Sequence, residues 1–147
     1  MTDGVAADTL ALQSLVAAYA RHADRREPEL VAALFEPDAV LRMVRRGDDG
    51  APAESRGHRH IASAVGRLRQ FPVTYHLVGN HTVAIDGDEA TGEAYCVAHH
   101  LMPHDEGGHV DHVMYIRYLD RYRRTDVGWR FAERETFVDW TADQLVP

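Results

Sequence analysis

Three residues far apart in the chain, Asp24, His76 and His99, have side chains suited to acid–base chemistry. A carboxylate beside an imidazole fixes the ring tautomer and stabilises the protonated ring, which makes a general acid or base near neutral pH. We predict that the three side chains meet in one pocket, where His99, held by Asp24, removes a proton next to a carbonyl group. His76 is expected to share a water molecule or to donate to the leaving group.

The elements that must position this trio follow from hydrophobic periodicity. Helical spacing predicts a helix from Asp8 to near Asp24, a short helix between Pro28 and Pro37, and a third helix around 61–68. A strand is expected over 39–45, followed by a polar loop over 47–52. Beyond Pro72 the period changes to two, which predicts an antiparallel meander with strands near 73–85, 90–101, 110–123 and 129–140. Helices first and a curved sheet later indicate one α+β domain over residues 1–147.

The strand that begins near Ala90 has two largely apolar faces. One carries Tyr95, Val97, His99 and Leu101, and the other carries Ala94, Cys96, Ala98 and His100. We expect one face to meet the helices and the other, lined by small residues, to pack against a second subunit. The predicted assembly is a homodimer or homotrimer.

Composition excludes several classes of function. The formal net charge of −7 argues against nucleic acid as a partner, and short basic runs such as Arg45-Arg46 do not reverse it. No lysine is present, so the chain cannot form a Schiff base with a carbonyl substrate. A glycine-rich phosphate loop, a dinucleotide fingerprint and a serine-hydrolase elbow are also absent from the sequence. We therefore expect no cofactor.

Location in the cell is predicted from what the chain lacks. The single Cys96 cannot form an internal disulfide, and residues 1–4 have neither the basic region nor the apolar core of a signal peptide. No apolar run is long enough to cross a bilayer, so no membrane contact is expected. The protein is predicted to be cytoplasmic.

Ten histidines raise metal binding as a rival hypothesis. The candidate ligands are His99, His104, His109 and His112, which lie near one predicted hairpin. Their spacing fits no standard zinc pattern, and structural zinc sites in small domains usually add cysteine thiolates. We therefore predict no metal site. Arg117 and Arg134 are candidates for binding an acidic group in the pocket, but we interpret them as surface or interface ion pairs.

Several segments, in this order, are similar to one family. They are Leu34-Phe35-Glu36-Pro37-Asp38-Ala39-Val40, Thr74-Tyr75-His76-Leu77-Val78-Gly79-Asn80, Ile85-Asp86-Gly87-Asp88-Glu89-Ala90 and Gly128-Trp129-Arg130-Phe131. Together with the helix order they resemble the SnoaL-like branch of the nuclear transport factor 2-like superfamily. The resemblance covers nearly the whole chain and implies a cone-shaped fold, with a strongly curved, mixed, mostly antiparallel sheet around the helices and one deep pocket.

Within that superfamily the chain resembles the scytalone dehydratases. Asp24 is similar to their aspartate near the end of the first helix, His76 to the histidine of a Thr-x-His-x-x-Gly stretch, and His99 to a histidine toward the end of the next long strand. Asp24 and His76 also resemble the dyad of a dehydrochlorinase. The chain has Ala23 and Met43 where the dehydratases have tyrosines that bind the substrate carbonyl, so Tyr19 or Tyr118 is the candidate phenol here.

These observations favour a cofactor-independent lyase, dehydratase-like, or an isomerase that acts on a hydrophobic carbonyl compound. The expected apolar wall consists of Leu15, Tyr19, Val97, Met114, Tyr118 and Phe137. Two alternatives stay open: an epoxide-opening hydrolase or cyclase on the same fold, and a non-catalytic ligand-binding or scaffold module.

Overall fold

The computed structural model describes residues 3–147, which form three α-helices, one short 3-10 helix and six β-strands. The helices are α1 (Asp3–Asp24), α2 (Pro28–Ala32) and α3 (Gly57–Gly66), and the 3-10 helix η1 (Arg67–Gln70) continues α3. The strands are β1 (Phe35–Arg45), β2 (Ala53–Arg56), β3 (Val73–Asp86), β4 (Glu89–Pro103), β5 (His109–Thr125) and β6 (Gly128–Val146). The predicted α+β fold is therefore confirmed.

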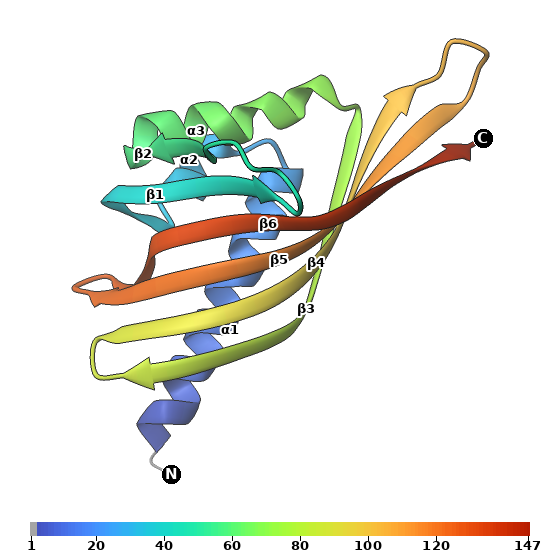
Figure 1. Cartoon of the computed structure of the whole chain (residues 1–147). Helices are drawn as coiled ribbons and strands as arrows, with labels where there is room; N and C mark the ends of the chain where they lie inside the picture. Colours follow the sequence, from blue (N-terminus) through green and yellow to red (C-terminus); the bar gives the residue numbers. More distant parts are fainter. Residues whose placement is uncertain (1–2) are drawn as a thin grey trace.

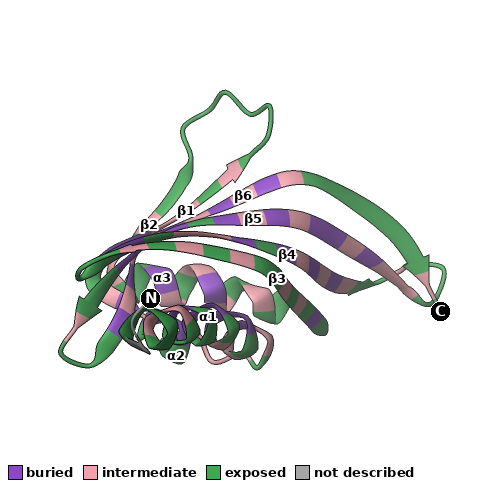
Figure 2. Ribbon diagram, turned by 90° about the horizontal axis from the view of Figure 1, so that it is seen from below, coloured by how far each residue is buried: buried purple, intermediate pink, exposed green. Residues whose placement is uncertain are grey.

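All six strands form one curved sheet in the order β2-β1-β6-β5-β4-β3. Only β1 and β6 pair in parallel among the described strands; the other neighbours are antiparallel. The sheet bends around α1 (Figure 1), and α1, α2 and α3 all lie against its concave face (Figure 2). This leaves the convex face without helices.

The C-terminal end of α1 is fixed by backbone geometry. Arg26 adopts a left-handed conformation with φ of 62°. The amide of Glu27 donates to the carbonyl of His22 at 3.0 Å, and the amide of Arg26 donates to that of Ala23 at 3.2 Å. This hydrogen-bond pattern terminates helices. Asp24 is thereby held as the last residue of α1, at the edge of β3.

The concave face of β4 carries small residues. Ala94, Cys96 and Ala98 are buried against the helices, whereas Tyr95 on the convex face is exposed. The prediction that the small-residue face meets a second subunit is therefore wrong. A sheet that curves tightly around a helix leaves little room on its concave side, so small side chains are needed there.

A bulge in the β3–β4 hairpin sets which residues share a face. Near the turn Thr82 pairs with Glu93, but beyond the bulge Gly79 pairs with Tyr95 and His76 with Ala98. Asn80, with φ of 49°, lies in the bulge. Residues directly opposite each other in a sheet share a face, so His76 lies on the concave side with Ala98.

Several element boundaries differ from the sequence-based ones. Helix α1 begins at Asp3 and not at Asp8, and strand β1 begins at Phe35, where a helix was expected. Strand β2 was not predicted, and β6 continues to Val146 instead of ending at Trp140. Within residues 3–147, none of the helices combines the length and apolarity that a membrane crossing requires.

Candidate active site

Asp24 and His76 form a hydrogen-bonded pair between the end of α1 and the start of β3. The Nδ1 atom of His76 lies 2.7 Å from Oδ1 of Asp24, and the backbone amide of His76 donates to Oδ2 at 2.9 Å. The His76 side chain is only 7% exposed, and that of Asp24 is 24% exposed. This is the pairing of carboxylate and imidazole that general base catalysis uses.

Two further residues hold the Asp24 carboxylate in place. The hydroxyl of Thr74 donates to Oδ1 of Asp24 at 2.9 Å, and the guanidinium of Arg26 donates to the same hydroxyl oxygen at 2.7 Å. Arg26 also donates to the carbonyls of Asp24 and Phe71. Because Arg26 can only donate, it directs the Thr74 proton toward Asp24. Sequence reasoning assigned no role to Arg26 or Thr74.

These contacts determine the charge of the Asp24 carboxyl group. Burial of Asp24 raises the pKa of its carboxyl, but hydrogen bonds from the His76 side chain and backbone and from Thr74 outweigh burial and hold the pKa below its usual value. The carboxylate is therefore ionised at neutral pH and accepts the Nδ1 proton. The Nε2 atom of His76 then carries the lone pair that can take up a proton.

The second histidine beside this pair is His100, not His99. Its ring is buried, and its centroid lies 5.6 Å from that of His76. The Nδ1 atom of His100 lies 3.2 Å from the backbone carbonyl of His112, which can only accept, so Nε2 is the free acceptor. Burial and the neighbouring His76 lower the pKa of His100, which favours the neutral ring.

His99 lies on the opposite face of β4, so the predicted meeting of His99 with Asp24 is wrong. Its Nδ1 atom lies 2.6 Å from Oδ2 of Asp111, and Gln144 donates to the same oxygen at 3.0 Å. The error follows from the bulge in β3: without it, the hairpin register would place His76 opposite His99. The Gly79-Asn80 dipeptide was the available signal, because both residues tolerate the left-handed backbone of a bulge.

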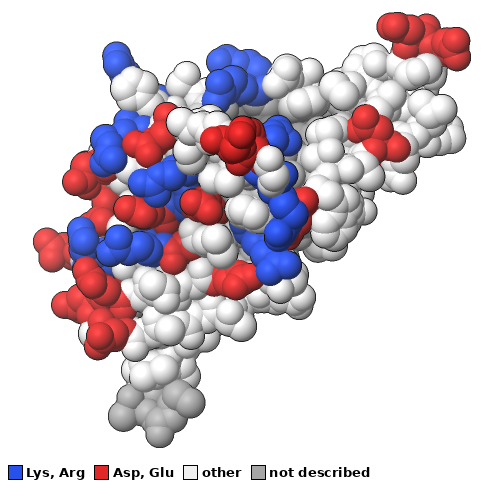
Figure 3. All heavy atoms as spheres, viewed as in Figure 1, with Lys and Arg blue, Asp and Glu red and all other residues white. Residues whose placement is uncertain are grey.

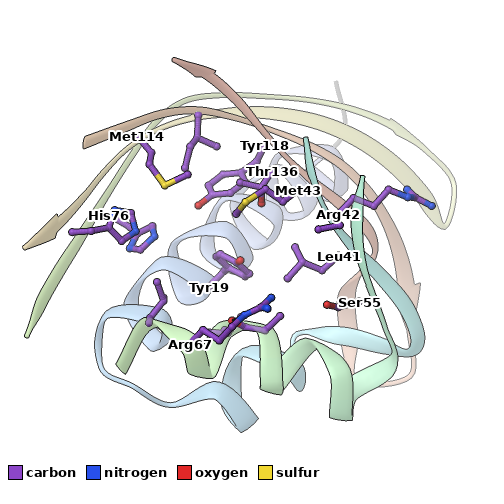
Figure 4. Close-up of a pocket in the computed structure, with 16 residues that line it drawn as sticks. Tyr19, Leu41, Arg42, Met43, Ser55, Arg67, His76, Met114, Tyr118 and Thr136 are labelled. Atoms are coloured by element: carbon purple, nitrogen blue, oxygen red, sulfur yellow. The ribbon is translucent and has the colours of Figure 1, made fainter. Parts of the chain in front are cut away.

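A cavity of about 150 Å³ lies beside His76 and His100, between the sheet and α3 (Figure 4). Three of the six residues predicted for the substrate wall, Tyr19, Met114 and Tyr118, line it. The other three do not: Leu15 packs in the core, and Val97 and Phe137 lie on the convex face. The remaining lining residues are Leu41, Arg42, Met43, Ala53, Ser55, Ala64, Val65, Arg67, Leu68, Ile116 and Thr136.

The two phenols of the cavity are supported from behind by a buried ion pair. Arg134 is bound to Asp120 through two hydrogen bonds of 2.8 Å. Its guanidinium lies over the rings of Tyr19 and Tyr118, at 4.3 and 3.9 Å from their centroids. The interpretation of Arg134 as a surface or interface residue is therefore wrong. Burial raises the pKa of Tyr19 and Tyr118, so both phenols stay protonated and can donate a hydrogen bond.

The histidines considered as metal ligands are dispersed. His99 pairs with Asp111 and His112 with Asp143, while the His104 ring accepts a hydrogen bond from the Glu106 amide in the hairpin loop. Among the side chains that the structure describes, those of residues 4–147, no three from His, Cys, Asp or Glu gather as ligands of one ion.

Comparison with known proteins identifies the family to which this chain belongs. Residues 5–135 match the SnoaL-like domain family. The uncharacterized protein Rv2910c of Mycobacterium tuberculosis strain H37Rv is 29% identical over 130 residues, which cover 86% of this chain and 82% of the relative.

Solved structures show the same fold. A candidate scytalone dehydratase from Novosphingobium aromaticivorans is 25% identical with a TM-score of 0.82, and the match covers 100% of this chain and 94% of that one. A hexachlorocyclohexane dehydrochlorinase is 15% identical with a TM-score of 0.75, over 96% of this chain and 91% of that one. A structure described as nuclear transport factor 2-like from Novosphingobium aromaticivorans also matches, with 25% identity and a TM-score of 0.69 over 91% of this chain and 83% of that one.

Proposed function

The chain belongs to the SnoaL-like family, and we propose that it is a cofactor-independent lyase or isomerase of a small, largely apolar carbonyl compound. The observation that carries the proposal is the partly buried Asp24–His76 pair, whose histidine lines a mostly apolar cavity. The similarity to the candidate scytalone dehydratase supports an elimination, and the fold shared with the dehydrochlorinase is compatible with it.

His76 acts as the general base in this proposal. Its Nε2 atom removes a proton from the carbon next to the carbonyl group, and the ionised Asp24 stabilises the imidazolium that forms. His76 then returns the proton, either to a departing hydroxyl, which completes an elimination, or to another carbon, which completes an isomerisation.

Three other side chains form hydrogen bonds with the substrate oxygens in this proposal. The protonated phenols of Tyr19 and Tyr118 donate to the carbonyl oxygen, on which negative charge develops as the proton leaves. The free Nε2 atom of neutral His100 accepts a hydrogen bond from a substrate hydroxyl and so orients the leaving group. Burial raises the pKa of the Cys96 thiol to about 11, so this side chain is not used as a nucleophile.

Exchange of substrate protons in D₂O tests the first step without requiring the natural leaving group. Proton NMR would follow deuterium incorporation next to the carbonyl of cyclic ketones and β-hydroxyketones. We expect wild-type protein to catalyse exchange on part of this panel, and H76A to lose about a hundred- to ten-thousand-fold of the rate.

The matched control is H99A, which removes a histidine of the same strand pair from the convex face. Its exchange rate should stay within about twofold of wild type, as for a surface substitution. Retained activity in H76A, or no exchange by the wild type on any ketone of the panel, would contradict the proposed function.

We also propose that the convex face is the contact surface between copies of the chain, in the predicted homodimer or homotrimer. Large apolar side chains are exposed there, namely Val73, Tyr75, Leu77, Tyr95 and Trp140. Figure 3 views this face: charged residues of both signs crowd its left half, and uncharged residues cover much of its lower right part.

A cytoplasmic location stays a prediction.

A further inference from the structure

Among the described residues that line the cavity, Arg67 is the cationic group that is free to bind a ligand at its mouth. It is the first residue of η1, directly after α3, and its side chain lines the cavity while remaining exposed. Its Nε atom donates a long hydrogen bond of 3.4 Å to the carbonyl of Ala64. No carboxylate of residues 4–147 lies within ion-pair distance of its guanidinium.

Arg42, the other arginine of the cavity, is already neutralised. It binds Glu54 at 2.9 Å and Glu133 at 3.3 Å. In Figure 4 its guanidinium points away from the cavity, whereas that of Arg67 extends toward it, below Tyr19. The two arginines therefore differ in both charge balance and direction.

The cavity contains no acidic group that could compensate Arg67. None of its lining residues is Asp or Glu, and Asp24 lies behind His76, outside the lining set. The two histidines of the floor each direct Nδ1 at an acceptor, the Asp24 carboxylate for His76 and the His112 carbonyl for His100. One unbalanced positive charge is thus placed at the opening of an otherwise apolar space, which favours an anionic ligand group.

Size limits the rest of the ligand. A cavity of about 150 Å³ is close to the space that one benzene ring fills in a dry protein core. The buried floor consists of apolar groups, phenols, imidazoles and the side chain of Thr136, so it fits a ring or short chain rather than a second charge.

We propose that the substrate is a one-ring or short-chain acid, whose carboxylate binds Arg67 at the mouth while its reacting carbon faces His76 on the floor. This deepens the proposed function and rests on it for the identity of the reacting end. Arg67 is then a substrate-binding residue that selects acids over their neutral analogues. Planar guanidinium groups bind carboxylates through paired hydrogen bonds, so the selection depends on geometry as well as on charge.

Binding of matched ligand pairs tests the proposal without any turnover. The probes are benzoate against benzamide and cyclohexanecarboxylate against cyclohexanecarboxamide, titrated by NMR at low salt. Wild-type protein should bind each acid about tenfold more tightly than its amide, as expected for a charge-assisted hydrogen bond. R67M should reduce that ratio to less than about threefold and R67K should retain part of it, because a lysine keeps the charge but loses the paired geometry.

Arg69 provides the matched control. It is an exposed arginine of the same 3-10 helix that does not line the cavity, so R69M should bind like wild type. The proposal is overturned if wild type binds no acid, if acid and amide bind equally, or if R69M lowers the ratio as much as R67M. A failure of the proposed function alone gives a different result: proton exchange persists in H76A, while acid binding still depends on Arg67.

Discussion

Two of the aspartate–histidine pairs have their histidines on opposite faces of the sheet, and these two pairs are inverted in burial. On the concave face His76 is 7% exposed and its partner Asp24 is 24% exposed. On the convex face the order is reversed, since His99 is 32% exposed and Asp111 only 5%. The two pairs have the same residue types at nearly the same separation. The aspartate is the more exposed partner in the first pair, and the histidine is the more exposed partner in the second.

The difference shows why a residue pair alone does not define a catalytic site. His76 lines a cavity with two phenols and a second histidine, so its free nitrogen can meet a substrate that is shielded from water. His99 has Tyr75 as its aromatic neighbour, with ring centroids 6.4 Å apart, and lies on the open face. Asp111 buries an oxygen, Oδ1, that has no partner among the described residues. Structural support, rather than proton transfer, is the role that fits the convex pair.

Replacing each aspartate by asparagine gives the sharpest comparison of the pairs. D24N removes the charge that stabilises the His76 imidazolium, and its amide can donate to Nδ1 and so move the ring proton to Nε2. We expect proton exchange to fall by about a hundred- to ten-thousand-fold in D24N and to change by less than about twofold in D111N.

The imidazole ¹⁵N chemical shifts of His76 report the same change directly. They should show protonated Nδ1 in wild type and in D111N, and protonated Nε2 in D24N. Equal rates in D24N and D111N would remove the functional distinction between the two faces.

Ion pairs on the two faces should differ in their contribution to stability. Arg134 and Asp120 are completely buried behind the cavity, whereas Arg117, on the convex face, is 43% exposed beside Asp139. R134M leaves the Asp120 charge buried without its partner, which should lower the free energy of unfolding by about 3–5 kcal/mol. R117M should cost much less than R134M, because Arg117 is exposed to water and Asp139 keeps Arg46 as its second partner.

Urea denaturation at neutral pH measures both variants. Should R134M fail to fold, the double variant R134M/D120L removes the unpaired charge and is expected to recover most of the stability. A cost for R134M no larger than that for R117M would mean that the buried pair does not support the cavity wall.

The convex face can also be tested for its proposed contact with a second subunit. Trp140 is 58% exposed and stacks on Tyr115 with ring centroids 4.3 Å apart. A central interface tryptophan contributes at least about 2 kcal/mol, so W140S should weaken self-association by about thirtyfold or more. Sedimentation velocity over a dilution series would show this shift, and wild-type protein that sediments only as a monomer would contradict the interface.

Much of this arrangement could be read from the sequence, but not the choice of histidine. The change from helical to alternating periodicity indicated helices followed by a meander. Asp24, His76 and His99 were predicted to meet in one pocket, and the structure brings the first two of them together. A one-residue bulge at Asn80 then reversed the face of every residue of β4 relative to His76. A register shift of one residue moves every side chain of a strand to the opposite face of the sheet, and local sequence rarely determines the register.

The convex residues Val97 and Phe137 were misplaced for a related reason. Both faces of the strands are apolar, so hydrophobicity could not tell concave from convex. Side-chain size held the missing information: the concave face of β4 has alanines and a cysteine where the convex face has tyrosine and valine. Arg26 acts through tertiary contacts with Thr74 and Phe71, which no local pattern reports.

The corrected assignment of the second histidine predicts a specific pH dependence of stability. Burial and His76 hold the pKa of His100 below its usual value, so the folded state keeps this ring neutral at a pH where the unfolded chain protonates it. Between the folded pKa and the unfolded value of about 6.5, the unfolded state binds more protons, and stability must rise with pH. One such group contributes a slope of at most about 1.4 kcal/mol per pH unit. H100N should reduce the slope of the unfolding free energy in this window, measured by urea denaturation at closely spaced pH values. An unchanged slope would show that His100 is solvated and charged like an exposed histidine, which is incompatible with its role as the neutral acceptor on the cavity floor.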